Sequence, residues 1–209
     1  MTRTGQRVVF ASAAESYAAL VRRLPDGCWD GPGLGDWDMR SLVGHTSRSL
    51  ITVSLYLRTA AQSEDVTSAA DYYAWVHEYS VSAGAAAIVE RGRQAGRDLG
   101  EDPVATIDAL VPRVLAELDE VDEVDDPLIE VIGGLGMRLS SYLPTRTFEL
   151  AVHSMDIAGA VGIDVVPPDD VLAEAAALAA RIGVRLGRGP GLLLSLTGRR
   201  DLPPGFSVV

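Results

Sequence analysis

The strongest constraint on the fold is a stripe of polar side chains on the helix predicted for residues 140–161, within SYLPTRTFELAVHSMDIAGA. At 100° per residue, Tyr142, Arg146, Glu149, His153 and Asp156 occupy roughly 80° of arc. Apolar positions border this stripe on both sides: Phe148 and Val152 on one, Leu143, Leu150 and Ile157 on the other. A polar stripe between apolar shoulders is typical of a helix that faces a cleft inside a bundle. Ionisable groups in such a cleft need a partner, either another side chain or a metal.

Helical periodicity also covers most of the chain before this segment. We predict four earlier helices, at residues 12–23, 39–57, 68–98 and 103–121. The first is expected to begin at Ser12, which forms an S-x-x-E capping box with Glu15. Asp38 can cap the second helix, and Asp102-Pro103 opens the fourth by the preferences of the N-cap and N1 positions. Pro112 would kink that fourth helix.

The end of the chain has a different pattern. A short strand is predicted at Leu128–Ile132, before a Gly-rich turn. An Ala-rich helix is predicted at 169–186, followed by strands at 191–198 and 206–209. The sequence therefore predicts a mainly α fold, with a helical bundle at 1–162 and a small α/β segment at 163–209. The apolar 169–186 helix would suit a homodimer interface.

Charge and composition exclude several classes of protein. Eighteen basic against 29 acidic residues give a net charge of −11, which repels phosphate backbones and anionic membrane surfaces. No apolar run approaches the length of a membrane span, and no signal peptide opens the sequence, so we expect a cytoplasmic protein without membrane or nucleic-acid partners. Cys28 is the single cysteine, which excludes an intrachain disulfide and any multi-cysteine metal site.

Glu149 and His153 stand at i and i+4, a spacing that lets a carboxylate and an imidazole converge on one ion. His45 is the candidate third ligand, because it lies at the border of the apolar stripe of its helix. His77 has only Tyr73 as a helical neighbour and is predicted to be a packed or surface residue. The same pattern also fits an exposed pair, or an ion pair of Glu149 with the arginine at i−3.

Two segments together resemble a known family: WDMRSLVGH, which ends at His45, and RTFELAVHSMDIAGA, which begins at Arg146. They are similar to the mycothiol-dependent maleylpyruvate isomerases of the DinB-like metalloenzyme superfamily, and the closing LTGRRDLPPGF also resembles these proteins. The resemblance implies a DinB-like four-helix bundle with a divalent metal, usually zinc, on His45, Glu149 and His153. It implies mycothiol, the low-molecular-weight thiol of actinobacteria, as cofactor, and the lysine-free composition fits a GC-rich genome.

The family chemistry implies that the metal deprotonates the thiol, which then adds to an electrophile as a nucleophile. The outcome would be cis–trans isomerisation of a maleylpyruvate-like substrate or, since the tail is shorter than in the isomerase, S-transfer to another electrophile. Arg146 would bind a substrate carboxylate and Asp156 would orient His153, although either could instead form a structural ion pair. Arg199 is placed at the cleft mouth, where it would hold an anionic ligand. A non-catalytic thiol-binding bundle or a buried ion-pair network are the alternatives.

Overall fold

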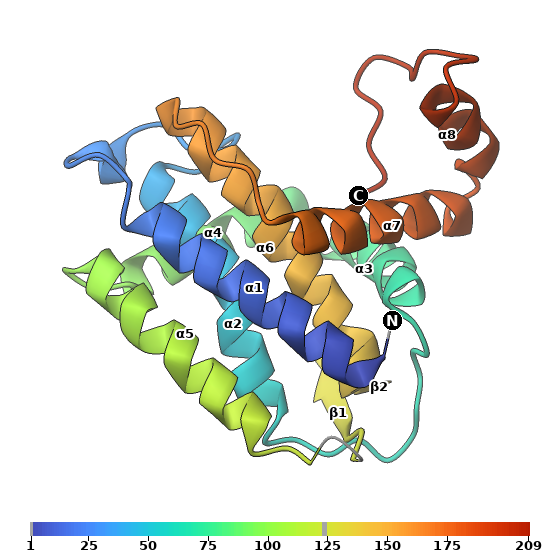
Figure 1. Cartoon of the computed structure of the whole chain (residues 1–209), viewed down its shortest axis with the longest axis horizontal. Coiled ribbons are helices and arrows are strands. Elements are labelled where there is room, and N and C mark those ends of the chain that lie inside the picture. Colours follow the sequence, from blue (N-terminus) through green and yellow to red (C-terminus); the bar gives the residue numbers. More distant parts are fainter. Residues whose placement is uncertain (1, 123–124) are drawn as a thin grey trace.

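The computed structural model describes residues 2–122 and 125–209, and this part of the chain is mainly helical (Figure 1). Four helices pack on one another as a bundle: α1 (Arg3–Val21), α2 (Met39–Tyr56), α5 (Pro103–Asp119) and α6 (Leu139–Val161). The predicted mainly α fold built on a helical bundle is confirmed. Among the described residues, no helix combines the length and the apolar character needed to cross a bilayer.

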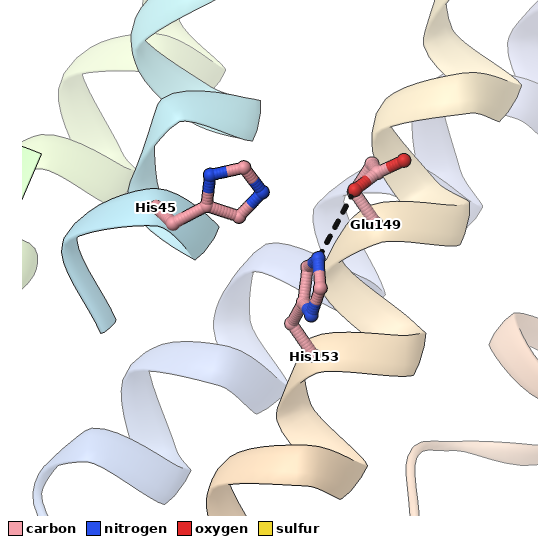
Figure 2. Close-up of side chains that lie close together, drawn as sticks. All are labelled: His45, Glu149 and His153. Atoms are coloured by element: carbon pink, nitrogen blue, oxygen red, sulfur yellow. Dashed lines mark ion pairs between the residues drawn. The ribbon is translucent and has the colours of Figure 1, made fainter. Parts of the chain in front are cut away.

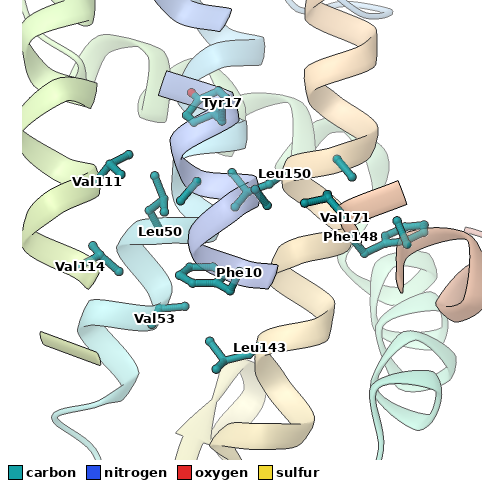
Figure 3. Packing of buried hydrophobic residues seen from close by; sticks show 14 of the residues in the cluster. Phe10, Tyr17, Leu50, Val53, Val111, Val114, Leu143, Phe148, Leu150 and Val171 are labelled. Atoms are coloured by element: carbon teal, nitrogen blue, oxygen red, sulfur yellow. The ribbon is translucent and has the colours of Figure 1, made fainter. Parts of the chain in front are cut away.

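The bundle core is formed by the apolar faces that the helical spacing predicts. Figure 3 shows side chains from all four helices meeting in it, among them Phe10, Leu50, Val114 and Leu143. Tyr17 is fully buried in this core, and its hydroxyl donates a hydrogen bond of 2.8 Å to the Val43 carbonyl. A buried phenol needs such a partner, because an unsatisfied polar group is costly in an apolar interior.

The predicted start of the first helix at Ser12 is wrong. Helix α1 begins at Arg3, and the Thr2 side chain caps it by accepting a hydrogen bond from the Gly5 amide. The apolar positions continue upstream of Ser12, and Val9 and Phe10 are buried there, so burial favours a longer helix. The hydroxyl of Ser12 instead donates to Asp170 at the start of α7.

The predicted helix at 68–98 is two helices, α3 (Ala69–Ala83) and α4 (Ala85–Asp98). Gly84 separates them with φ of +81°, and a right-handed helix requires a negative φ. Helix α4 packs closely on α2, where Gly44 lies against the backbone of Ala95 and Gly96. A Cβ atom on Gly44 would stand 2.3 Å from the Gly96 nitrogen, so the absence of a side chain permits this crossing.

The predicted strand after residue 128 is confirmed as β1 (Leu128–Val131). It pairs antiparallel with β2 (Leu135–Arg138), in the register Leu128 with Arg138 and Val131 with Leu135. A 3₁₀ turn (Ile132–Gly134) connects the strands, and its glycines adopt positive φ. A second 3₁₀ turn (Cys28–Asp30) lies in the loop after α1.

The two strands predicted beyond residue 190 are wrong. Helix α7 (Asp169–Arg185) is present as predicted, but residues 189–196 form α8 (Gly189–Leu196), and 206–209 have no regular structure. In the described chain the sheet contains only β1 and β2, so a strand here would lack a partner, whereas a helix satisfies its own backbone groups. The division at residue 162 stays a prediction; α6 ends at Val161 with Gly162 as its C-cap, and α7 packs back on α6 and α3.

Candidate metal centre and its cavity

Three side chains that the sequence analysis singled out converge between α2 and α6. His45 comes from α2, and Glu149 and His153 come from consecutive turns of α6 (Figure 2). One potential ligand atom from each of the three lies within 4.8 Å of the other two. This cluster of two imidazoles and one carboxylate could hold a metal ion, and the predicted convergence is confirmed.

The distances within the cluster are close to those that a metal imposes. His153 Nε2 lies 3.2 Å from Glu149 Oε2, and the imidazole rings of His45 and His153 stand edge to face with centroids 5.0 Å apart. Ligand atoms about 2.0–2.2 Å from a tetrahedral ion are roughly 3.4 Å apart. The α6 pair already has this separation, and the candidate ligand atom of His45 lies within 4.8 Å of both.

Two further side chains contact Glu149 and His153 and fix their orientation. The Tyr73 hydroxyl on α3 donates a hydrogen bond of 2.5 Å to Glu149 Oε1, which is the carboxylate oxygen facing away from His153. Asp156 Oδ2 lies 2.9 Å from His153 Nδ1, which leaves Nε2 directed at Glu149. The predicted contact of Asp156 with His153 is thus present. Sequence reasoning missed Tyr73, because nothing local to α3 indicates that it reaches a residue 76 positions away.

The protonation states of the α6 pair follow from these contacts. Burial alone would raise the pKa of Glu149, but the hydrogen bond from His153 and the charge of Arg146 lower it to about 2. Burial alone would lower the pKa of His153, but hydrogen bonds to Asp156 and Glu149 raise it to about 9. At neutral pH the metal-free protein therefore holds an ionised glutamate beside a protonated imidazole.

His45 is in the opposite state. Burial and the neighbouring positive charge of His153 lower the pKa of His45 to about 4, so this imidazole is neutral at physiological pH. Its ring packs on the indole of Trp37, with centroids 4.4 Å apart, and the indole donates a hydrogen bond to the Val89 carbonyl. His45 Nδ1 is buried and has no hydrogen-bond partner in the described structure. A neutral imidazole carries a lone pair on one of its two nitrogens, and Figure 2 shows that Nε2 is the nitrogen that faces Glu149 and His153.

A cavity of about 220 Å³ opens beside His45 and Glu149, between α2, α3, α4 and α6. Its walls carry five tyrosines: Tyr56, Tyr72, Tyr73, Tyr79 and Tyr142. Arg48 on α2, Arg91 on α4 and Arg146 on α6 also line it. The polar stripe of α6 thus faces a cleft, as we predict from the apolar residues on both sides of the stripe.

Arg146 lies in the cavity wall and forms no ion pair with Glu149. Its Nε donates a hydrogen bond of 2.9 Å to Thr145 Oγ1, and its guanidinium lies over the ring of Tyr142, 4.9 Å from the centroid. No carboxylate of the described chain comes within ion-pair distance of Arg146. The guanidinium therefore faces the cavity, where the sequence analysis expects it to meet a substrate.

The other candidates lie away from this centre. Arg199 is exposed in the tail after α8, donates to the carbonyl of Thr197, and does not line the cavity. His77 is exposed on α3 and outside the cluster, as predicted. Cys28 is half-buried in its 3₁₀ turn, and burial raises the pKa of its thiol, which disfavours the reactive thiolate.

The sequence of this chain matches a known protein family over the residues that build this site. The family model of the mycothiol maleylpyruvate isomerase N-terminal domain matches residues 10–158, well over half of the chain. Neither the curated proteins nor the solved structures give a significant match. The matched range contains His45, Glu149 and His153 together with the helices that line the cavity. The chain therefore belongs to the mycothiol maleylpyruvate isomerase N-terminal domain family.

Proposed function

We propose that this protein is a metal- and thiol-dependent enzyme. His45, Glu149 and His153 would bind a divalent metal, zinc in our proposal, that activates mycothiol for addition to an electrophilic substrate, as in maleylpyruvate cis–trans isomerisation. The convergence of these three side chains beside a cavity is the observation that carries the proposal. The family match supports the thiol as the second component.

The residues present fit a catalytic metal. Two imidazoles and one carboxylate are a donor set of catalytic zinc sites, which keep one position open for an exogenous ligand. A metal bound here would lower the pKa of a thiol in that position and so supply a nucleophile at neutral pH. A buried ion-pair network without metal is the competing interpretation, and it accounts only for the α6 pair. It gives no role to the neutral His45 ring, whose Nε2 faces Glu149 and His153 (Figure 2).

The protein's own side chains would hold the reactants. Tyr73 orients the Glu149 carboxylate, and Asp156 orients the His153 imidazole, so both ligands are directed before a metal arrives. Arg146, turned toward the cavity, would bind a carboxylate of the substrate and position it beside the metal centre. The aromatic walls would limit access of water to the reacting atoms.

The direct test is turnover of a cis-configured maleylpyruvate by protein reconstituted with zinc, with mycothiol, with glutathione and without thiol. We expect turnover only when metal and mycothiol are both present, and loss of turnover after chelation. Product analysis by NMR would distinguish a trans isomer from a stable thioether, which would assign the protein to S-transfer instead. Binding of one thiol without any metal-dependent turnover across a panel of electrophiles would contradict the enzymatic proposal and favour a binding protein.

Tyr73→Phe should weaken zinc binding by about tenfold or more, because partners that orient a ligand typically contribute this much to metal affinity. The phenylalanine keeps the edge-to-face packing on Phe148 and removes only the hydroxyl that contacts Glu149. Competition with a chromophoric chelator at pH 7 measures the change. Tyr56→Phe, on the cavity wall, is the matched control, and an affinity within twofold of wild type for Tyr73→Phe would count against the orienting role.

Zinc affinity should rise by up to tenfold per pH unit between pH 7 and about pH 9 and then level off. His153, whose pKa is raised to about 9, must lose its proton to bind metal, whereas Glu149 and His45 are already in their binding forms. In the metal-free protein the same raised pKa contributes stability that is complete below about pH 6.5 and lost as the pH rises through about 9. NMR titration of the histidines in the metal-free protein measures the pKa of His153, on which both the zinc affinity and the stability depend. A midpoint for His153 near pH 6.5 would refute both expectations.

A further inference from the structure

The cavity wall carries three guanidinium groups in a protein whose net charge is −11. Arg48, Arg91 and Arg146 are each half-buried, and within the described ranges none of them has a carboxylate within ion-pair distance. Five other arginines do form ion pairs: Arg22, Arg58, Arg97, Arg138 and Arg185. An acidic chain thus places three arginines without an ion-pair partner around the cavity beside the candidate metal centre.

Among the described residues that line this cavity, Glu149 is the one that carries a carboxylate, and both of its oxygens already have partners. Those oxygens contact Tyr73 and His153, and in the proposed function Glu149 is a metal ligand. All three arginine charges act on Tyr56, since each favours the ionised form of its hydroxyl, so they surround one region of the cavity. Half-buried charges without partners in the protein are the expected surroundings of a bound anion.

Arg48 and Arg146 are displaced along their helices from the candidate metal centre, in the same direction and by about the same distance. Helices α2 and α6 run antiparallel, because His45 contacts His153 at one end while Thr52 accepts a hydrogen bond from Tyr142 at the other. Arg48 stands three residues after His45, and Arg146 three residues before Glu149, so both are displaced toward the same end of the cavity. Three residues correspond to about 4.5 Å along a helix axis.

The Arg146 guanidinium is held by its neighbours in a way that leaves its two Nη groups available to a ligand. Thr145 occupies its Nε, and the rings of Tyr142 and Tyr72 lie 4.9 Å and 5.6 Å from its central carbon. In the described structure the hydrogen bond from Nε is the only one that Arg146 donates, so neither Nη group is engaged. Two parallel N–H donors held in one plane match the geometry of a carboxylate or phosphate oxygen pair.

We propose that Arg48 and Arg91 complete, together with Arg146, an oxyanion subsite that selects the electrophilic substrate by a carboxylate or phosphate group. This inference rests on the proposed function for the identity of the reacting centre, which the subsite would hold about one helical turn from the metal ligands. A cavity of about 220 Å³ is smaller than the roughly 300–1,000 Å³ of pockets for drug-sized ligands, so the anion is a small metabolite. Arg48 and Arg91 would be specificity-determining residues.

Calorimetry of the zinc-loaded protein at low ionic strength tests this subsite, with succinate, inorganic phosphate and the uncharged dimethyl succinate as probes. We expect succinate or phosphate to bind at least about tenfold more tightly than the diester, because hydrogen bonds to charged groups are among the strongest in proteins. Preferential binding of succinate would identify a carboxylate substrate, and preferential binding of phosphate a phosphorylated one. Equal binding of all three probes would overturn the proposal.

Arg48→Gln and Arg91→Gln should each weaken anion binding by about tenfold, and the double variant by more, while zinc content stays at the wild-type value. Arg48→Lys, which retains the charge, should restore part of the affinity. Exposed Arg113 on α5 supplies the matched control, as Arg113→Gln. Anion binding that survives the double variant would place the anion elsewhere, for instance on the metal, and would overturn the proposal. If the protein failed to bind zinc at all but still showed arginine-dependent anion binding, the subsite would stand and the proposed metal-dependent function would be refuted.

Discussion

Replacing His45 with alanine should reduce the zinc content of the purified protein from near one equivalent to close to zero. Glu149 and His153 remain in this variant, but two ligands from one helix hold a divalent ion poorly, and α2 offers no other donor to the cluster. Because a catalytic metal supplies several kcal/mol of transition-state stabilisation, we expect turnover to fall by roughly 1,000-fold or more. Metal analysis and thiol-dependent turnover measure the two effects on the same preparation.

The chain provides a matched control for this experiment in His77, which is exposed on α3 and outside the cluster. His77→Ala should retain zinc and activity. The His45 variant should also keep its fold, because the ring is removed from the edge of a cavity rather than from the bundle core. Unchanged zinc content in His45→Ala, with unfolding like that of wild type, would show that the metal is bound elsewhere or not at all.

Gly44→Val should lower the free energy of unfolding by about 3 kcal/mol or more, which is at the upper end for overpacked sites. The new Cβ would be 2.3 Å from the Gly96 nitrogen and 2.4 Å from the Ala95 carbonyl carbon, which are backbone atoms that cannot rotate away. Helix α4 would have to move off α2, and it carries Val89, which holds Trp37 over His45. Urea unfolding measures the stability loss, and the zinc affinity of the folded fraction should fall as well.

Gly159→Ala on α6 is the control for this prediction. No atom lies within 4 Å of the position of its Cβ, and its backbone is helical. Alanine there should raise the free energy of unfolding by about 0.5–1 kcal/mol, because glycine loses more conformational entropy in a helix. A Gly44 variant as stable as wild type would mean that the helix crossing is looser than the contact at Gly96 indicates.

Local signals in the sequence predicted much of the helical architecture. The Asp102-Pro103 pair marks the start of α5, where Asp102 caps the amide of Ala105, and the Asp38 side chain caps α2 at Ser41. Capping acts between residues three apart, so the sequence contains all the information it needs. The same type of reasoning failed at Ser12, because a valid capping box there competes with burial of the apolar residues before it.

The tail shows the limit of such reasoning. An apolar run such as Leu192–Leu196 fits a strand or a helix equally well, and the choice depends on whether a neighbouring strand is present. In the described structure the sheet ends with β1 and β2, so this run becomes part of α8. Strand β2 was missed for the complementary reason, since its pairing with β1 depends on the positive-φ glycines of the intervening turn.

By itself, the sequence determined that Glu149, His153 and Asp156 share one face of a helix, since positions three and four apart coincide in any α-helix. It also pointed to His45, through periodicity and family resemblance. Only the tertiary structure decided that Tyr73 contacts Glu149, that Trp37 packs on His45, and that Arg48 and Arg91 join Arg146 around one cavity. These residues lie on separate elements, and no local rule sets the distance between them. That distance follows from how closely the helices pack, which here depends on the contact between Gly44 and Gly96.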